Sequence, residues 1–499
     1  MPNQELGWTL DPGFRKLRRP LFPDEMPDEI QPSLWMVAPF VVLLGFIALA
    51  HVLCPGWWAR HYAKVAFGLG AITLVYYFAV LRAPAAVFRT GMDYFSFMCV
   101  VGSLYVVAGG IHIEVKPAGS PAASTIFLFI GALAANVLGA TGACMLLIRP
   151  WLRMNRRRLA GYHVVFFIFV LSNVGGALLP MGPPLFLGYL QGVPFWWVAK
   201  ACWPMWLTCV GILLGMFWIL DTVHHRRARA EQLDPDTGPP RWKFAGLSNL
   251  FFAGVILAAV FIKHPPFLRE GLMIAASAAS YFTTPKSVHE TNAFNFHPLV
   301  EVAVLFAGIF ATMMPALDWL QSNAAQLGQP GPALFFWGSG VLSSVLDNAP
   351  TYLSFLHAGF GAFAPPDAVA AVLAYFKVHG TDVSALAAGT PHADEIRTAL
   401  MSLQRLVPSG LARGDLTVVQ VQMAMLLANP LGVKCLQALS MGSVFFGACT
   451  YIGNGPNFMV KSIAENRRAP TPTFPGYLFN YTLPFMLPLL IVIWFLFFR

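Results

Sequence analysis

Four short segments of the sequence combine helix-breaking residues with residues that carry oxygen and amide groups. They are residues 134–142, 172–184, 343–351 and 447–457. Each places several of Gly, Pro, Asn and Ser or Thr in the middle of an apolar stretch, where Pro removes a helical hydrogen bond and Gly permits turns that expose carbonyls. Freed carbonyls, Asn amides and hydroxyls suit a hard cation such as Na⁺, whereas half-helix N-termini suit an anion. The segments therefore predict binding of a small ion at membrane depth.

One such segment alone is equally typical of a kinked helix or of a packing interface between small residues. Here, however, the segments occupy equivalent places in two halves of the chain. Residues 133–144 can be laid on residues 342–353 without a gap, and the segments at Gly176 and Gly447 match at a larger offset because an insertion lies between them. This repetition favours ion binding over packing alone.

Asp347 is the lone acidic residue of the four segments, and an ionisable residue inside a membrane is by default a candidate for function. Its carboxylate could bind Na⁺ when ionised and a proton otherwise, or it could cap a helix N-terminus, and both roles are compatible. Glu301 follows His297 by four residues on one helical face, which suits either a proton route or an interfacial ion pair. His112, Glu114, Asp221 and His224 are expected at the membrane interface.

The composition predicts the elements that position these residues. The chain has 499 residues, of which 57% are hydrophobic and 11% are charged, whereas soluble domains carry about 25% charged residues. Apolar runs close to the roughly 20 residues that span a bilayer recur along the chain. We therefore expect an all-α polytopic membrane protein, and a soluble multidomain protein is excluded. The net charge of +9 reflects loop Lys and Arg, including a solvated run from Arg153 to Arg158, so no nucleic-acid partner is expected.

The order of apolar runs predicts two inverted repeats of five transmembrane helices each, every repeat with a re-entrant hairpin and a discontinuous helix. A polar N-terminal tail without a cleavable signal peptide covers residues 1–32. Repeat 1 covers 33–220, with a hairpin at 122–149 and a broken helix at 159–192. After a basic linker at 221–242, repeat 2 covers 243–499, with a hairpin at 331–358, an extramembrane insertion at 360–420 and a broken helix at 431–464. The basic 149–158 and 221–243 loops are expected in the cytoplasm, with both termini outside.

The runs SNVGGALLPMGPPLFLGYL, LSSVLDNAPTYLSFL and FFGACTYIGNGPNFMVKSIAE resemble the ion transporter superfamily. Within it, the chain is most similar to bacterial citrate transporter-like proteins, often named sodium:proton antiporters, and to NhaD-type antiporters. The resemblance implies that hairpin tips and helix breaks form the cation and substrate sites. The implied first site comprises Asn136, Gly139, Thr141, Ser172, Asn173, Gly175, Gly176 and Gly182. The implied second site comprises Ser343, Ser344, Asp347, Asn348, Thr351, Thr450, Gly453, Asn454 and Asn457.

The first tip departs from the superfamily pattern, because Gly139-Ala140-Thr141 replaces the usual Ser-Asn-Thr and Leu179 replaces a common Thr. These departures weaken the case for a full cation site in the first repeat. The resemblance further implies a homodimer in the bacterial inner membrane, surrounded by lipid, that needs no cofactor beyond Na⁺ as transported or coupling ion.

The predicted function is Na⁺/H⁺ antiport by alternating access, with Asp347 and Asn348 as Na⁺ ligands and Asp347 or Glu301 as the proton-coupling group. The closest alternative is a cation-coupled symporter of citrate, a dicarboxylate or another small anion. That symporter would favour Arg or Lys near the tips, and the four segments contain none. A membrane enzyme would need His and carboxylate residues at metal-ligand spacing, and a channel would need a continuous pore in place of paired broken helices.

Overall fold

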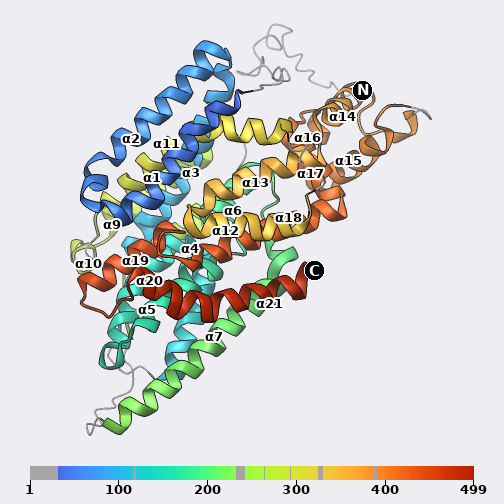
Figure 1. The fold of residues 1–499 in the computed structure, drawn as a ribbon. Coiled ribbons are helices and arrows are strands. Elements are labelled where there is room, and N and C mark those ends of the chain that lie inside the picture. Colours follow the sequence, from blue (N-terminus) through green and yellow to red (C-terminus); the bar gives the residue numbers. More distant parts are fainter. Residues whose placement is uncertain are drawn as a thin grey trace, which may run out of the picture.

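The computed structural model describes residues 32–115, 120–231, 242–262, 265–292, 294–323, 330–386 and 390–499. Helices dominate this part of the chain (Figure 1). Seven of the described helices are long and apolar enough to cross a bilayer, or eight if one pair bent by 71° counts as a single span. Large apolar side chains such as Phe67, Ile72 and Phe78 remain exposed on these helices, as expected where lipid is the solvent. The protein is therefore a multi-pass membrane protein.

Helices from both halves of the chain interleave in a flanking unit. The first half contributes a 3₁₀ turn (Leu34–Val37), α1 (Ala38–Leu53), α2 (Pro55–Val75, extended by a π turn Tyr76–Val80) and α3 (Pro84–Gly109). The second half contributes α8 (Asn249–Val260), α9 (Leu268–Thr283), α10 (Lys286–Thr291) and α11 (His297–Asn323). Helix α2 packs on α11, and α9 packs on α3. Apolar side chains such as Phe97, Phe306 and Phe310 fill the space between the two halves.

The remaining membrane helices form a core unit around a second hydrophobic cluster that includes Phe166, Phe169 and Tyr477. From the first half come α4 (Pro121–Met154), a 3₁₀ turn (Arg156–Arg158), α5 (Gly161–Phe167, extended by Ile168–Asn173 and Val174–Gly176), α6 (Pro183–Leu190) and α7 (Trp197–Glu231). From the second half come a π turn (Leu334–Gly338), α12 (Ser339–Val345), α13 (Asn348–Phe363), α18 (Pro430–Phe445, extended by Phe446–Cys449), α19 (Gly455–Asn466), α20 (Phe474–Tyr477), a π segment (Leu478–Met486) and α21 (Leu487–Phe497).

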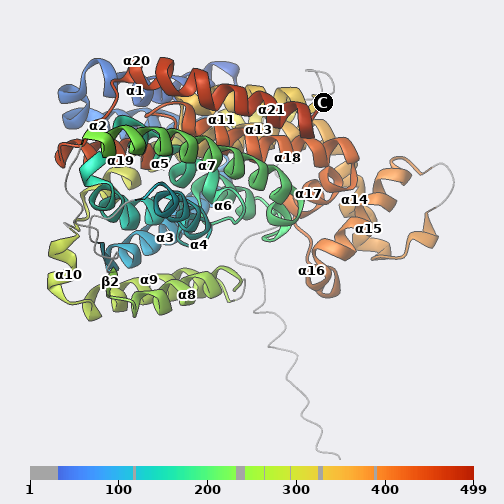
Figure 2. The same cartoon turned by 90° about the horizontal axis from the view of Figure 1, so that it is seen from below.

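The segment between α13 and α18 folds as a small helical cap at one end of the molecule (Figures 1 and 2). It contains α14 (Pro366–His379), a 3₁₀ turn (Val383–Ala385), α15 (Ala393–Leu406), α16 (Pro408–Arg413) and α17 (Val418–Ala428). Val372, Ile396 and Leu400 belong to a hydrophobic core of its own. We call this end of the molecule the insertion face.

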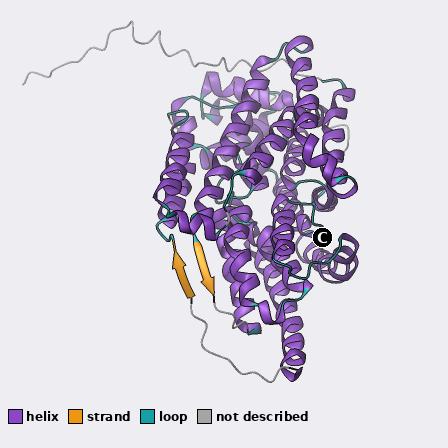
Figure 3. Ribbon diagram, turned by 90° about the vertical axis from the view of Figure 1, so that its left-hand side faces the viewer, coloured by secondary structure: helices purple, strands orange, loops and turns teal. Residues whose placement is uncertain are grey.

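The opposite end carries two short antiparallel strands, β1 (His112–Val115) and β2 (Trp242–Ala245), with His112 opposite Ala245 (Figure 3). We call this end the β face. The all-helical prediction missed these strands, because each consists of only four residues next to a predicted span. Helix α7 also continues to Glu231, so the first part of the predicted linker at 221–242 is helical.

Two predicted spans are too short in the structure. Helices α8 and α9 have 12 and 16 residues, or about 18 and 24 Å, against a hydrocarbon core of about 30 Å. Strand β2 and a turn at Gly246 take up the start of the segment predicted at 243–262. The predicted count of ten spanning helices is therefore not reached within the described part of the chain.

Candidate functional site

Helix α4 reverses its direction at Gly139, whose φ of 69° is left-handed. The Ser124 hydroxyl donates to Asn155 Oδ1 at 2.9 Å although 31 positions separate them, and a straight helix would hold them about 46 Å apart. The ring of Phe127 likewise lies 5.5 Å from that of Trp151. The two arms of α4 therefore lie side by side, with both ends at the β face and a tip at Gly139.

Asn136 fastens this tip to the break between α5 and α6, which covers residues 177–182. Its Nδ2 donates to the Gly175 carbonyl at 2.7 Å, and its Oδ1 accepts the Leu178 N–H at 2.9 Å. A Cβ at Gly139 would lie 2.6 Å from the Met181 carbonyl oxygen, so this approach requires glycine. Asn136 was predicted as an ion ligand, but here both ends of its amide bind backbone of the protein.

A second hairpin enters from the insertion face and turns between α12 and α13, at Leu346 and Asp347. Its arms are in contact, because the rings of Phe335 and Phe355 lie 6.0 Å apart. The Asp347 carboxylate accepts the Ala349 N–H at 3.0 Å and so caps α13. The capping role considered from the sequence is thus present, and one carboxylate sits at this tip.

Thr450 joins the second tip to the break between α18 and α19, which covers residues 450–454. Its hydroxyl donates to the Ser344 carbonyl at 2.5 Å and accepts the Gly453 N–H at 3.0 Å. Ser343 donates to the Ser443 carbonyl of α18 at 2.5 Å. These bonds hold the tip and the break as one rigid assembly.

Three carbonyl oxygens converge on Gly453 in this assembly. A Cβ there would lie 2.8 Å from the oxygens of Gly447 and Ser343 and 3.0 Å from that of Ser344. The Asn348 Nδ2 lies 3.5 Å from the position that a Cβ would take at Gly447, and Asn348 is only 2% exposed. Asn348 Oδ1 accepts no hydrogen bond from the described residues. A buried amide oxygen without a donor is costly, so this oxygen and the neighbouring carbonyls fit a bound cation.

Three further amides connect the two halves of the chain beside this tip. Asn173 Nδ2 donates to Asn457 Oδ1 at 2.9 Å, and Asn454 Nδ2 donates to the Ser172 carbonyl at 2.8 Å. Asn457 Nδ2 in turn donates to the Gly447 carbonyl at 2.7 Å. The structure thus brings Ser172, Asn173, Asn454 and Asn457 together, with their amide N–H groups already used by the protein.

The remaining predicted residues divide between the two tips and a separate helix. Thr351 donates to the Asp347 carbonyl at 3.1 Å. Thr141 and Gly139 line a small cavity against Val101 and Leu104 of α3. The break residues Gly176 and Gly182 lie on the same side of the core unit, Gly176 against the Ala135 carbonyl and Gly182 as the N-cap of α6. Glu301 is half-buried on α11, outside the four segments.

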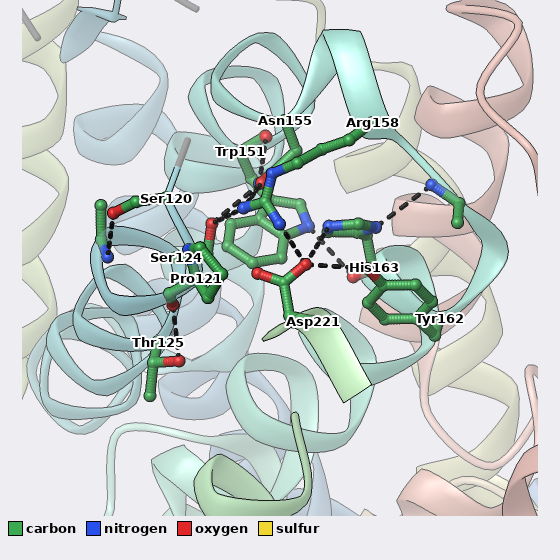
Figure 4. A network of polar contacts seen from close by, with 12 residues as sticks. Ser120, Pro121, Ser124, Thr125, Trp151, Asn155, Arg158, Tyr162, His163 and Asp221 are labelled. Carbon is green, nitrogen blue, oxygen red and sulfur yellow. Dashed lines mark hydrogen bonds and ion pairs between the residues drawn. The ribbon is translucent and has the colours of Figure 1, made fainter. Parts of the chain in front are cut away.

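A buried charged network lies at the base of the first hairpin (Figure 4). Asp221 Oδ1 accepts hydrogen bonds from Arg158 and, at 2.8 Å, from the Tyr162 hydroxyl. Arg158 also donates to Ser124 at 2.8 Å and to Asn155 at 2.9 Å. This network, which we call the clamp, therefore joins both arms of α4 to α5 and α7.

The clamp corrects the prediction that the whole run from Arg153 to Arg158 is solvated, because Arg158 is 8% exposed and Asp221 is fully buried. His163 completes it: Nδ1 accepts the Ala160 N–H at 3.1 Å, and Nε2 lies 3.3 Å from Asp221 Oδ1. Because Nδ1 accepts, the proton is on Nε2, so the imidazole is neutral and its Nε2 faces the carboxylate. The sequence contained one signal for this pair, namely a lone Asp near the end of an apolar run and a basic cluster near the end of another. The two residues, Arg158 and Asp221, are 63 positions apart.

A family model described as "Putative citrate transport" matches residues 29–498. The match includes both hairpins, both broken helices and every membrane helix of the two units. No curated protein matches the chain. The paired hairpins and helix breaks, together with a match over nearly the whole chain, lead to one conclusion: the protein belongs to this citrate transport family.

Proposed function

We propose that the protein is a secondary active transporter that binds Na⁺ at the second hairpin tip and exchanges it for protons. The observation that carries this proposal is the buried Asn348 side chain, whose Oδ1 accepts no hydrogen bond from the described residues, next to the converging carbonyls of Ser343, Ser344 and Gly447. These groups supply only oxygen, the ligand that hard cations prefer. Asp347 adds one negative charge beside them and so favours a cation over a neutral solute.

The packing of the helices supports alternating access by two inverted repeats. If each helix is replaced by the corresponding helix of the other half, every contacting pair should map onto another contacting pair. The pair α2–α11 corresponds to α9–α3, α1–α11 to α8–α3, and α6–α13 to α19–α4. All six pairs are in contact. The hairpins also enter from opposite faces. Rocking of the core unit against the flanking unit would expose the tips to one face at a time.

Exchange follows from competition at one carboxylate. When Asp347 is ionised, it stabilises Na⁺ at the tip; when it carries a proton, it offers no charge to the ion. The empty carrier therefore returns with a proton, and no separate proton carrier is needed. Glu301 remains the reserve candidate for this role.

The alternative is cation-coupled symport of citrate or another small anion. The family description favours it, and so does the first tip, where Leu138 stands in place of Asp347 and a small cavity separates Thr141 from α3. The second tip would then hold the coupling Na⁺. We further expect a homodimer in the bacterial inner membrane, with the β face in the cytoplasm because Arg149 to Arg158 lie there.

Reconstituted protein can distinguish the two functions. Liposomes with an internal pH dye would be challenged with Na⁺, Li⁺, K⁺ and citrate in turn, and uptake of labelled citrate would be followed in parallel. Antiport predicts a Na⁺-driven pH change without citrate, whereas symport predicts Na⁺-dependent citrate uptake. Failure of Na⁺ to drive either signal would refute a Na⁺ site at the second tip.

A further inference from the structure

Three arginines meet at the β face, where the core unit contacts the flanking unit. Arg149 and Arg153 lie one turn apart on the second arm of α4, and Arg467 directly follows α19. Arg149 is half-buried and lies within electrostatic reach of both other guanidinium groups and of Tyr105 on α3. Positive charge is thus concentrated at one point by elements of both repeats.

None of these three guanidinium groups forms an ion pair with a carboxylate in the described part of the chain. The carboxylate of α19, Glu465, is bound by Lys461 at 2.6 Å. Arg149 makes one long hydrogen bond, from Nη1 to the Met145 carbonyl at 3.4 Å, although a guanidinium has five N–H donors. Like charges held together repel each other, so an anion bound among these three guanidinium groups would relieve that cost.

Arg149 and Arg153 lie on the same face of α4 as Thr141 at the first tip. On α4, Thr141 lines the cavity at the tip, Met145 lies one turn further out, and Arg149 and Arg153 follow at the same four-residue spacing. Residues four apart share one face of a helix. Met145 packs with Tyr105, and the half-buried Ile463 of α19 packs against them. Arg467 lies one turn beyond Ile463, since its N–H donates to the Ile463 carbonyl at 3.2 Å.

We infer that Arg149, Arg153 and Arg467 form a binding site for a multivalent oxyanion at the β-face mouth of the contact between the two units. The apolar contact of Met145, Tyr105 and Ile463 separates this site from the cavity at the first tip. Guanidinium groups bind carboxylate and phosphate oxygens in the same bidentate manner. The ligand is therefore a free polycarboxylate or phosphate, or a phospholipid headgroup, and this site does not depend on the proposed function.

The test uses the full chain in nanodiscs of zwitterionic lipid at low ionic strength, with citrate as the probe. The thermal midpoint would be followed against citrate concentration, with chloride at matched ionic strength as the reference. The double variant Arg149→Gln/Arg467→Gln should weaken the apparent citrate affinity by about tenfold or more, because charge-assisted bonds are lost. The matched control is Arg156→Gln/Arg157→Gln, which removes the same charge from exposed residues of the 3₁₀ turn that follows α4.

A second arm distinguishes the source of the anion. Nanodiscs containing anionic lipid would be analysed by native mass spectrometry for lipid retained on wild type and on both double variants. Loss of citrate response in the Arg149/Arg467 variant assigns the site to a soluble anion, and selective loss of retained anionic lipid assigns it to a headgroup. If both responses equal those of the wild type, or if the control variant loses them equally, the site does not exist.

Discussion

Asn136 and Asn348 lie beside the two hairpin tips but use their amides differently. Both ends of the Asn136 amide bind backbone groups of the neighbouring break. Asn348 Oδ1, by contrast, is buried without a donor in the described structure. The residue types alone do not separate a ligand from a fastening group, because the difference depends on which backbone atoms the opposite segment presents. This difference is the reason why we propose the second tip, and not the first, as the cation site.

Asp347→Asn should abolish proton coupling while the protein remains folded, because Asn is also a favourable N-cap and can accept the Ala349 N–H. The proposed competition between Na⁺ and protons predicts that the apparent Na⁺ affinity of wild type rises with pH by at most about tenfold per unit and then levels off. In the variant it should not depend on pH. The check is Na⁺-driven pH change in liposomes; a wild-type rate in the variant would move the coupling role to Glu301.

Gly139→Ala should destabilise the first tip by about 1–3 kcal/mol, because a residue with a side chain would be held at positive φ and its Cβ would lie 2.6 Å from the Met181 oxygen. Gly182→Ala is the matched control in the same region, since its φ is −91° and nothing lies within 4 Å of the added Cβ. Thermal unfolding in detergent measures both. Equal midpoints for the two variants would contradict the tight contact between tip and break.

At the scale of elements, apolar runs interrupted by Gly, Pro and Asn predict two hairpins and two broken helices. The lengths of the helices could not be predicted equally well from the sequence. Helix α4 contains 34 residues only because it folds back. Helix α8 is short because residues 242–245, at the start of the predicted span, form a strand that pairs with β1. Strand pairing between segments more than a hundred positions apart leaves no periodic signal in four residues.

The clamp should stabilise the base of the first hairpin. Asp221→Asn would leave Arg158 buried without a counter-charge and should cost about 3–5 kcal/mol. Glu465→Gln, which breaks the exposed pair with Lys461, should cost less than about 1 kcal/mol. Thermal midpoints of purified protein would be compared, together with the double variant Asp221→Leu/Arg158→Met, which should recover part of the loss. A single Asp221 variant as stable as the Glu465 variant would show that the pair is not structural.

At the scale of the whole molecule, the two halves interleave, so neither half could form the flanking unit alone. The sequence suggested the repeat through matching segments, but it could not show that α2 packs on α11 and α9 on α3. Those contacts join helices whose nearest ends are more than 150 positions apart, and their pairing depends on side-chain shape in three dimensions. Each half thus contributes one helix to both of these equivalent contacts, which supports an inverted repeat.

The proposed orientation predicts which loops meet the cytoplasm. A single cysteine at position 156, at the β face, should react with an impermeant thiol reagent only after permeabilisation. A cysteine at position 381, in the helical cap of the insertion face, should react in intact cells. A cysteine at 122 should behave like the one at 156, because both ends of α4 meet. Opposite labelling of positions 122 and 156 would contradict the hairpin.

The central claim, that the second tip binds Na⁺, is tested most directly by Na⁺-dependent thermal stabilisation of Asn348→Ala. Wild type should unfold at higher temperature as Na⁺ replaces N-methylglucamine at constant ionic strength, because a ligand of the folded state stabilises it. Asn348→Ala should respond only at Na⁺ concentrations at least about tenfold higher. The control Ser354→Ala, about two turns further along α13, should respond like wild type. An Asn348→Ala protein with the wild-type Na⁺ response would contradict the account.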